Sequence, residues 1–93
     1  MRENMFKNFL LGEVTAKSAV NNMKNARKVE SILGISLDSI VCDDDIMYES
    51  LLQLRLSDNL KYGHTQKALR KYYKFANGKE FPKLKKYHSV KHP

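Results

Sequence analysis

Four basic side chains recur along the segment from residue 64 to residue 76 at the spacing of successive helical turns. They are Lys67, Arg70, Lys71 and Lys74, which fall on one side of a helix. Side chains of this type, presented in a row, contact the phosphates of a nucleic-acid backbone. Gln66 and Arg70 could also reach base edges, because amide and guanidinium groups hydrogen-bond to them. The pattern therefore favours nucleic-acid binding.

A second row of the same kind lies on the segment from residue 16 to residue 33. It contains Lys17, Asn21, Lys24 and Lys28 on one side of a helix, with Asn25 beside them. Asn21 and Asn25 could also reach base edges through their amide groups. The outer positions of both helices lack acids. A face that serves only solubility usually mixes both signs, because Glu–Lys pairs four residues apart stabilise a helix. A solvated face with a chance bias remains the alternative for each helix taken alone.

The charge of the chain is divided unevenly between its two parts. Residues 1–60 carry seven Lys or Arg and nine Asp or Glu, whereas residues 61–93 carry ten Lys or Arg and one acid. The net charge of +7 predicts a polyanionic partner, either nucleic acid or an acidic protein. We expect no membrane partner, because the bundle needs the apolar face of the basic helix.

Other residue types that could do chemistry lack the necessary arrangement. His64, His88 and His92 have neither the spacing nor the neighbouring ligands of a zinc site. The aspartates at 43–45 are better explained as a helix cap than as a cation site. A single cysteine, Cys42, excludes a disulfide framework. The sequence therefore predicts a protein that is not an enzyme and has no cofactor or metal.

Helices have to position both basic rows, because helical spacing dominates and no run alternates as a strand does. Four helices are predicted: Glu3 to Leu11, ended by Gly12; a helix capped by Thr15, running to Leu33 and closed by Gly34; Ile46 to Leu56, capped by an aspartate; and His64 to Ala76, stopped by Asn77-Gly78. Residues 35–45 are expected to be a connection and Ser57 to Gly63 a loop. The predicted fold class is all-α: a compact orthogonal bundle of four or five helices, SAM-like in type.

The apolar positions on these helices predict the core. The expected core side chains are Met5, Phe6, Phe9, Leu10, Ala16, Ala19, Val20, Met23, Ala26, Leu33, Ile35, Leu37, Ile40, Ala68, Leu69, Tyr72, Phe75 and Ala76. Tyr73 is expected to be partly exposed. One helical domain would cover residues 1–78, followed by a basic, partly mobile tail from 79 to 93. Its Phe81-Pro82 would dock on the domain, and Lys83, Lys85 and Lys86 would assist DNA binding.

The order of these patterns resembles a known family. The carrying stretches are TAKSAVNNMKNARKVESILGISLDSI, DDDIMYESLLQL and ALRKYYKFANG. They are similar to the N-terminal SAM-like, or core-binding, domain of phage-integrase-type tyrosine recombinases, a version of which is appended to some restriction endonucleases. The resemblance covers about Met5 to Lys79. It implies a helical bundle that clasps duplex DNA, and puts these residues at the interface: Lys17, Asn21, Lys24, Asn25, Lys28, Gln66, Lys67, Arg70, Lys71 and Lys74.

The chain also departs from that family. Recombinases continue into a catalytic domain with an Arg, His-x-x-Arg and Tyr constellation, whereas this chain ends at Pro93. We therefore expect a non-enzymatic module that binds double-stranded DNA, an accessory or regulatory factor of a phage or other mobile element. The lack of a signal peptide or long apolar run predicts a cytoplasmic location. The alternative is a protein-interaction module that inhibits or recruits a nuclease or another acidic protein. The oligomeric state stays open.

Overall fold

The chain is helical along most of the part that the computed structural model describes, residues 1–57 and 63–91. The elements are α1 (Glu3–Glu13), α2 (Ala16–Leu33), α3 (Leu37–Val41), α4 (Asp44–Ser57), α5 (His64–Asn77) and α6 (Leu84–Lys91). No strand occurs in these ranges, so the predicted all-α class is confirmed. The predicted loop from Ser57 to Gly63 lies largely outside the described residues.

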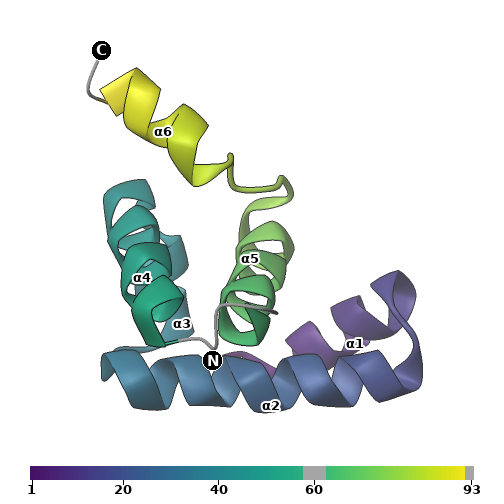
Figure 1. The fold of residues 1–93 in the computed structure, drawn as a ribbon. Coiled ribbons are helices and arrows are strands. Elements are labelled where there is room, and N and C mark those ends of the chain that lie inside the picture. Colours follow the sequence, from purple (N-terminus) through teal and green to yellow (C-terminus); the bar gives the residue numbers. More distant parts are fainter. Residues whose placement is uncertain (58–62, 92–93) are drawn as a thin grey trace.

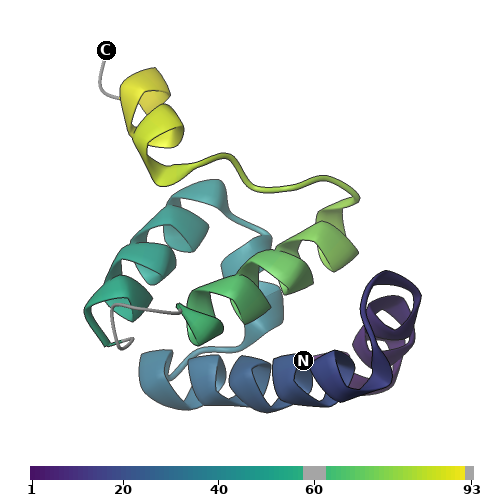
Figure 2. The ribbon, with the colours of Figure 1, turned by 45° about the vertical axis from the view of Figure 1, so that its right-hand side comes forward.

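Helix α2 runs across one end of the molecule, and α4 and α5 rise from it (Figure 1). The most extensive contact between helices joins α2 and α5, and α5 also packs against α1, α3 and α4. Residues 78–83 lead from the end of α5 back to α6, which lies at the end of the molecule remote from α2 (Figure 2). None of the described helices combines the length and the apolar character that crossing a membrane would require.

The long helix α2 begins and ends at its predicted signals. The Thr15 hydroxyl accepts a hydrogen bond from the backbone N–H of Ser18 at 3.2 Å, which satisfies a donor left unpaired at the helix start. Gly34 follows the helix with a φ of 72°, a left-handed conformation that favours glycine. Its N–H donates to the Glu30 carbonyl at 2.9 Å. Both predicted caps of this helix are confirmed.

Helix α1 runs past Gly12, where the sequence predicted its end, and finishes at Glu13. The last helical hydrogen bond joins the Val14 N–H to the Leu10 carbonyl at 2.8 Å. A glycine inside a helix costs only about 1 kcal/mol, which the complete burial of Phe6 and Leu10 can outweigh. The extension matters for the surface, because it carries Glu13 to the side of α5.

Two short helices occupy segments that the sequence assigned to a connection and to a tail. In the connection, Leu37 and Ile40 are fully buried as predicted, and α3 forms around them. Ile35 was also expected in the core but is 42% exposed. Where a basic, partly mobile tail was expected, residues 84–91 form α6. The preceding Phe81 is buried against the ring of Tyr73, with the ring centroids 5.1 Å apart.

The core differs from its prediction at five positions: Met5, Ala16, Val20 and Ile35 are exposed, and Tyr73 is more deeply buried than expected. Met5 and Val20, assigned to the core by their spacing, are 59% and 62% exposed. Tyr73, expected to be partly exposed, is 2% exposed. Its ring is covered by Phe81, which lies outside the helices that were predicted. The remaining buried apolar side chains come from all six helices and from Phe81: Phe6, Leu10, Ala19, Met23, Ala26, Val29, Leu37, Ile40, Val41, Met47, Leu51, Leu54, Ala68, Leu69, Tyr72 and Tyr87.

The three consecutive aspartates at the start of α4 have separate structural roles. The Asp43 carboxylate accepts from the backbone N–H groups two and three residues later, at 2.9 and 3.2 Å, which confirms an aspartate cap. Asp44 accepts from the Tyr73 hydroxyl at 2.8 Å, and Asp45 from the Tyr87 hydroxyl at 2.6 Å. In the described part of the chain, no group of three or more His, Cys, Asp or Glu could hold a metal ion.

These hydroxyl–carboxylate bonds change the pKa values of the tyrosines. Burial and the hydrogen bond to Asp44 together raise the pKa of Tyr73 to about 12. The hydrogen bond to Asp45, aided by burial, raises the pKa of Tyr87 further above its ordinary range. Deprotonation would place a phenolate against a carboxylate. The two bonds therefore hold α5 and α6 to the start of α4 while both tyrosines are neutral.

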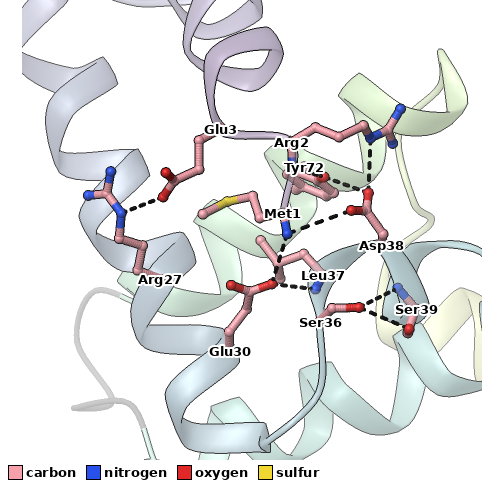
Figure 3. Close-up of polar contacts among 10 residues, drawn as sticks. All are labelled: Met1, Arg2, Glu3, Arg27, Glu30, Ser36, Leu37, Asp38, Ser39 and Tyr72. Atoms are coloured by element: carbon pink, nitrogen blue, oxygen red, sulfur yellow. Dashed lines mark hydrogen bonds and ion pairs between the residues drawn. The ribbon is translucent and has the colours of Figure 1, made fainter.

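The N-terminal residues tie α1, α2, α3 and α5 together at one point (Figure 3). The α-amino group of Met1 lies 3.4 Å from the Glu30 carboxylate and 3.7 Å from that of Asp38. Asp38 also accepts from the Arg2 guanidinium at 3.0 Å and from the Tyr72 hydroxyl at 2.6 Å. Burial alone would raise the pKa of Asp38, but the Tyr72 and Arg2 hydrogen bonds bring it below its ordinary value. This cluster fixes the orientation of α5 relative to α2.

Candidate nucleic-acid interface

The basic row of α5 lies on the side of the helix that faces away from the core. The opposite side is fully or almost fully buried and consists of Thr65, Ala68, Leu69, Tyr72 and Tyr73. On the outer side, Lys67 is exposed, and Arg70, Lys71 and Lys74 are partly exposed. The division of this helix into a core face and a basic face is therefore as the sequence predicts.

The basic row does not form a flat surface, because it lines a hollow of about 420 Å³. We call this feature the basic hollow. Its walls come from α2, α5 and the connector of residues 78–83, and its lining residues are Asn22, Lys67, Arg70, Lys71, Lys74, Glu80, Phe81 and Lys83. Five cationic side chains and one carboxylate thus meet around one space. Positive charge therefore predominates around this space and raises the local potential, which the Glu80 carboxylate offsets in part.

Arg70 forms the wall between α5 and the connector. Its Nη1 donates to the Phe81 carbonyl at 2.9 Å and to the Pro82 carbonyl at 3.3 Å. The guanidinium carbon also lies 5.9 Å from the centroid of the Phe81 ring. Burial lowers the pKa of Arg70, and the nearby Glu80 acts in the opposite direction. The side chain predicted to read bases therefore has a structural role, since it holds the connector against α5.

Two of the lysines on α5 share an acid that sequence spacing did not reveal. Glu13, at the end of α1, lies 3.1 Å from the Lys74 ammonium and 3.8 Å from that of Lys71. All three side chains are about 30% exposed, so these ion pairs are partly screened by solvent. The outer side of α5 contains no acid of its own, but Glu13 of α1 approaches this row in the folded structure.

The basic row of α2 lies on a different side of the molecule. Its members are exposed except for the half-buried Asn25, and they are Lys17, Asn21, Lys24 and Lys28. The three lysines lie about 160° to 180° around the helix from the buried residues that face the core. Since α5 packs on that buried side, the lysines of α2 point away from α5. The residue that α2 contributes to the basic hollow is Asn22.

The remaining candidate residues are spread over other surfaces. Gln66 precedes the buried Tyr73 by seven residues, so it lies on the α4 side of α5 and does not line the hollow. Lys85 and Lys86 are exposed on α6. Of the three tail lysines predicted to assist DNA binding, Lys83 alone lines the hollow.

Sequence reasoning missed four residues of this site: Asn22, Phe81, Glu13 and Glu80, the last being the carboxylate that lines the hollow. Asn22 follows Asn21 in the sequence but lies about 100° further around the helix, on the side that lines the hollow with α5, so the projection that selected the outer lysines did not include it. Phe81 had been assigned only a docking role, although its position brings Lys83 to the site. Glu13 gave no sequence signal, because its contact with α5 joins residues about 60 positions apart.

No family model matches the chain, and neither a curated protein nor a solved structure shows significant similarity to it. The resemblance to the core-binding domain of tyrosine recombinases therefore depends on the sequence patterns alone.

Proposed function

We propose that the protein binds double-stranded DNA through the basic hollow and the exposed side of α5, without acting on the DNA as an enzyme. The observation that carries the proposal is the convergence of five cationic side chains from α5 and the connector on one space. Lysine and arginine in such clusters neutralise backbone phosphates. The resemblance to SAM-like core-binding domains supports the same function, that of an accessory or regulatory factor of a phage or other mobile element.

The dimensions of the basic row suit a duplex. From Lys67 to Lys74 the helix rises by about 10 Å, close to the roughly 12 Å width of the major groove of B-DNA. Lys83 extends the charge onto the connector. Lys85 and Lys86 are exposed on α6 and add to the positive field of the protein. The lysines of α2 point elsewhere, so they contribute through the general field of the protein rather than by contact.

An acidic protein is the alternative partner for the same surface. Protein–protein interfaces are enriched in aromatic residues and methionine and depleted in lysine, especially at their centre. The basic hollow has the opposite composition: four of its eight lining residues are lysines, and its one aromatic residue is 4% exposed. This composition favours a phosphate backbone over a protein surface.

Two matched triple variants test the proposal. Replacing Lys67, Lys71 and Lys83 by glutamine removes three charges from the hollow, and replacing Lys17, Lys24 and Lys28 by glutamine removes three from the outer side of α2. Fluorescence anisotropy with a labelled duplex would give the affinity over a series of salt concentrations. Each phosphate contact contributes about −0.9 to the slope of log affinity against log salt. We expect the hollow variant to lose about 2.7 from that slope, and the α2 variant to lose much less.

The two variants have the same net charge, so a general electrostatic effect would weaken both equally. Equal loss in the two variants, or no measurable affinity of the unaltered protein for the duplex, would contradict the proposal. Polyglutamate, added as a competitor at matched charge concentration, separates the alternative. An acidic protein is the better partner if polyglutamate fully displaces the duplex from the unaltered protein and the hollow variant keeps its affinity for DNA.

A further inference from the structure

We propose that the basic hollow is a specific seat for one phosphate group together with its attached sugar, and not only a region of high positive potential. This inference rests on the proposed function, because the phosphate would be supplied by the backbone of the bound DNA. It goes further by naming the chemical unit that enters the hollow and the groups that hold it.

The first argument comes from the unused donors of Arg70. A guanidinium has five N–H donors, and its Nη1 accounts for two of them through the Phe81 and Pro82 carbonyls. The described residues provide no carboxylate within 4.0 Å of Arg70. None of the buried side-chain nitrogen or oxygen atoms described lacks a hydrogen-bond partner. The donors on Nε and Nη2 must therefore reach solvent, and Arg70 lines the hollow.

The second argument is the electrostatic state of the same side chain. Arg70 is partly desolvated, which lowers the pKa of its guanidinium, and the nearby Glu80 offsets only part of that effect, so the charge of Arg70 is held at a cost in free energy. An anion in the hollow would offset that cost. Because Nη1 is fixed by two backbone carbonyls, the orientation of the remaining donors is set before a ligand arrives. Such preorganisation reduces the entropy lost on binding.

The third argument concerns the exposed lysines that line the hollow. Lys67 and Lys83 are exposed and have no carboxylate within ion-pairing distance among the described residues. Lys67 comes from α5 and Lys83 from the connector, and both line the hollow together with Arg70. Lys71 and Lys74 are already partly neutralised by Glu13. Lys67 and Lys83 are therefore the lysines with the most to gain from an incoming phosphate.

The size of the hollow extends the ligand beyond a bare phosphate ion. A volume of about 420 Å³ lies within the range of small-molecule sites, roughly 300–1,000 Å³. An inorganic phosphate would leave most of it to water. Asn22 supplies a polar group at the α2 wall, where its Nδ2 donates to the Ser18 carbonyl at 2.9 Å and leaves the amide oxygen as an acceptor. A hydroxyl of the sugar beside the phosphate would donate a hydrogen bond to this amide oxygen, and the edge of the sugar ring would pack against the same wall.

Three probes distinguish the sources of the phosphate: inorganic phosphate, thymidine 5′-monophosphate and the dinucleotide TpT, which contains one backbone diester. Two-dimensional ¹H–¹⁵N spectra of the full chain would follow backbone amides during each titration. We expect saturable shifts of amides near Asn22, in α5 and in residues 78–83. TpT and the monophosphate should bind more tightly than inorganic phosphate, because they fill the hollow.

A matched pair of double variants makes the test specific. Replacing Lys67 and Lys83 by glutamine should weaken binding of TpT by about tenfold, since hydrogen bonds to charged groups are each worth more than neutral ones. Replacing Lys24 and Lys28 by glutamine removes the same charge from α2 and should change the affinity less than about twofold. All four lysines are exposed, so circular dichroism and thermal unfolding should show both variants folded.

The outcomes separate this inference from the proposed function. Shifts that do not saturate, that spread over all lysine-rich surfaces, or that weaken equally in both double variants would overturn the specific seat. So would inorganic phosphate binding as tightly as TpT, because the sugar would then contribute nothing. If duplex binding holds while the seat fails, DNA is held by diffuse charge alone. If TpT binds as expected but duplex DNA does not, the seat stands as a site for a free nucleotide and the DNA proposal fails.

Discussion

The basic rows of α2 and α5 carry the same kinds of side chain at similar helical spacing, but the two rows have different surroundings. On α2, Lys24 and Lys28 are exposed, and no described carboxylate lies within ion-pairing distance of them. On α5, Arg70 is bonded to the connector, and Lys71 and Lys74 share Glu13. One row is a convex face in solvent, and the other lines a concave space.

The comparison shows that the spacing of charges along a helix does not determine what those charges do. Exposed lysines on a convex face interact weakly, because water and salt screen them. The same charges around a hollow face one another across low-dielectric walls, which strengthens their effect on a ligand. The difference arises from the connector and from α1, neither of which belongs to the basic helices.

The largest expected contrast between the two rows concerns stability. Replacing Arg70 by alanine would leave the Phe81 and Pro82 carbonyls without their donor and remove the packing of the guanidinium on the Phe81 ring. Hydrogen bonds to charged groups contribute about 1.5–3 kcal/mol, so we expect a loss of that order in the free energy of unfolding. Replacing Lys24 by alanine should change it by less than about 0.5 kcal/mol. Urea unfolding followed by circular dichroism would measure both.

The contrast would disappear if both variants unfolded at the same urea concentration. Arg70 would then be a solvated side chain like Lys24, and the connector would be held by Phe81 alone. A variant with lysine in place of Arg70 sharpens the result, because it keeps the charge but not the two-carbonyl geometry. We expect its stability to fall between that of the alanine variant and that of the unaltered protein.

A second contrast concerns the inner side of α5, which is held through Tyr73 and Asp44. The pKa of Tyr73 is raised from 10.0 to about 12, so the folded state keeps this proton when the unfolded state has lost it. The corresponding stability is fully present below pH 10 and is lost as pH rises through about 12. Replacing Tyr73 by phenylalanine should lower the free energy of unfolding at pH 7 by about 1–2 kcal/mol.

The same variant should also lose part of the alkaline decline in stability. Thermal unfolding at intervals between pH 9 and pH 12 would show it, with replacement of Tyr48 by phenylalanine as a control, since Tyr48 is only partly buried. Tyr72 and Tyr87 also have raised pKa values, so a part of the decline should remain. If the unaltered protein and the Tyr73 variant lost the same stability between pH 9 and pH 12, the hydrogen bond to Asp44 would contribute nothing to the pH dependence of stability.

The fold was predictable from local signals wherever a single residue decides the structure. Thr15 and Gly34 define α2, and an aspartate cap starts α4, because these residues satisfy helix ends by themselves. Helix α6 was not predictable in this way. Its attachment depends on Tyr87 reaching Asp45, 42 residues away, and no periodic pattern within eight residues reveals such a contact.

The candidate site was predictable in its composition but not in its geometry. The helical projection correctly placed Lys67, Lys71 and Lys74 on the outer side of α5. It could not show that Arg70 would be bonded to the connector or that Glu13 would approach the row. These features depend on the packing of separate elements, which the spacing within one helix does not encode.

The smallest expected contrast tests whether Glu13 restrains the row on α5. Replacing Glu13 by glutamine frees Lys74 and Lys71, which it approaches at 3.1 and 3.8 Å. Ion pairs of this exposure contribute up to about 1 kcal/mol, so we expect duplex affinity in the anisotropy assay to rise by no more than about fivefold. The matched control replaces Glu3 by glutamine, because Glu3 pairs with Arg27 of α2 at 2.7 Å. Both variants raise the net charge of the protein by one. Only the Glu13 variant should gain more duplex affinity than this change in net charge provides. An equal rise in both would show that DNA responds to the total charge of the protein, and the distinction between the two rows would then have no functional meaning.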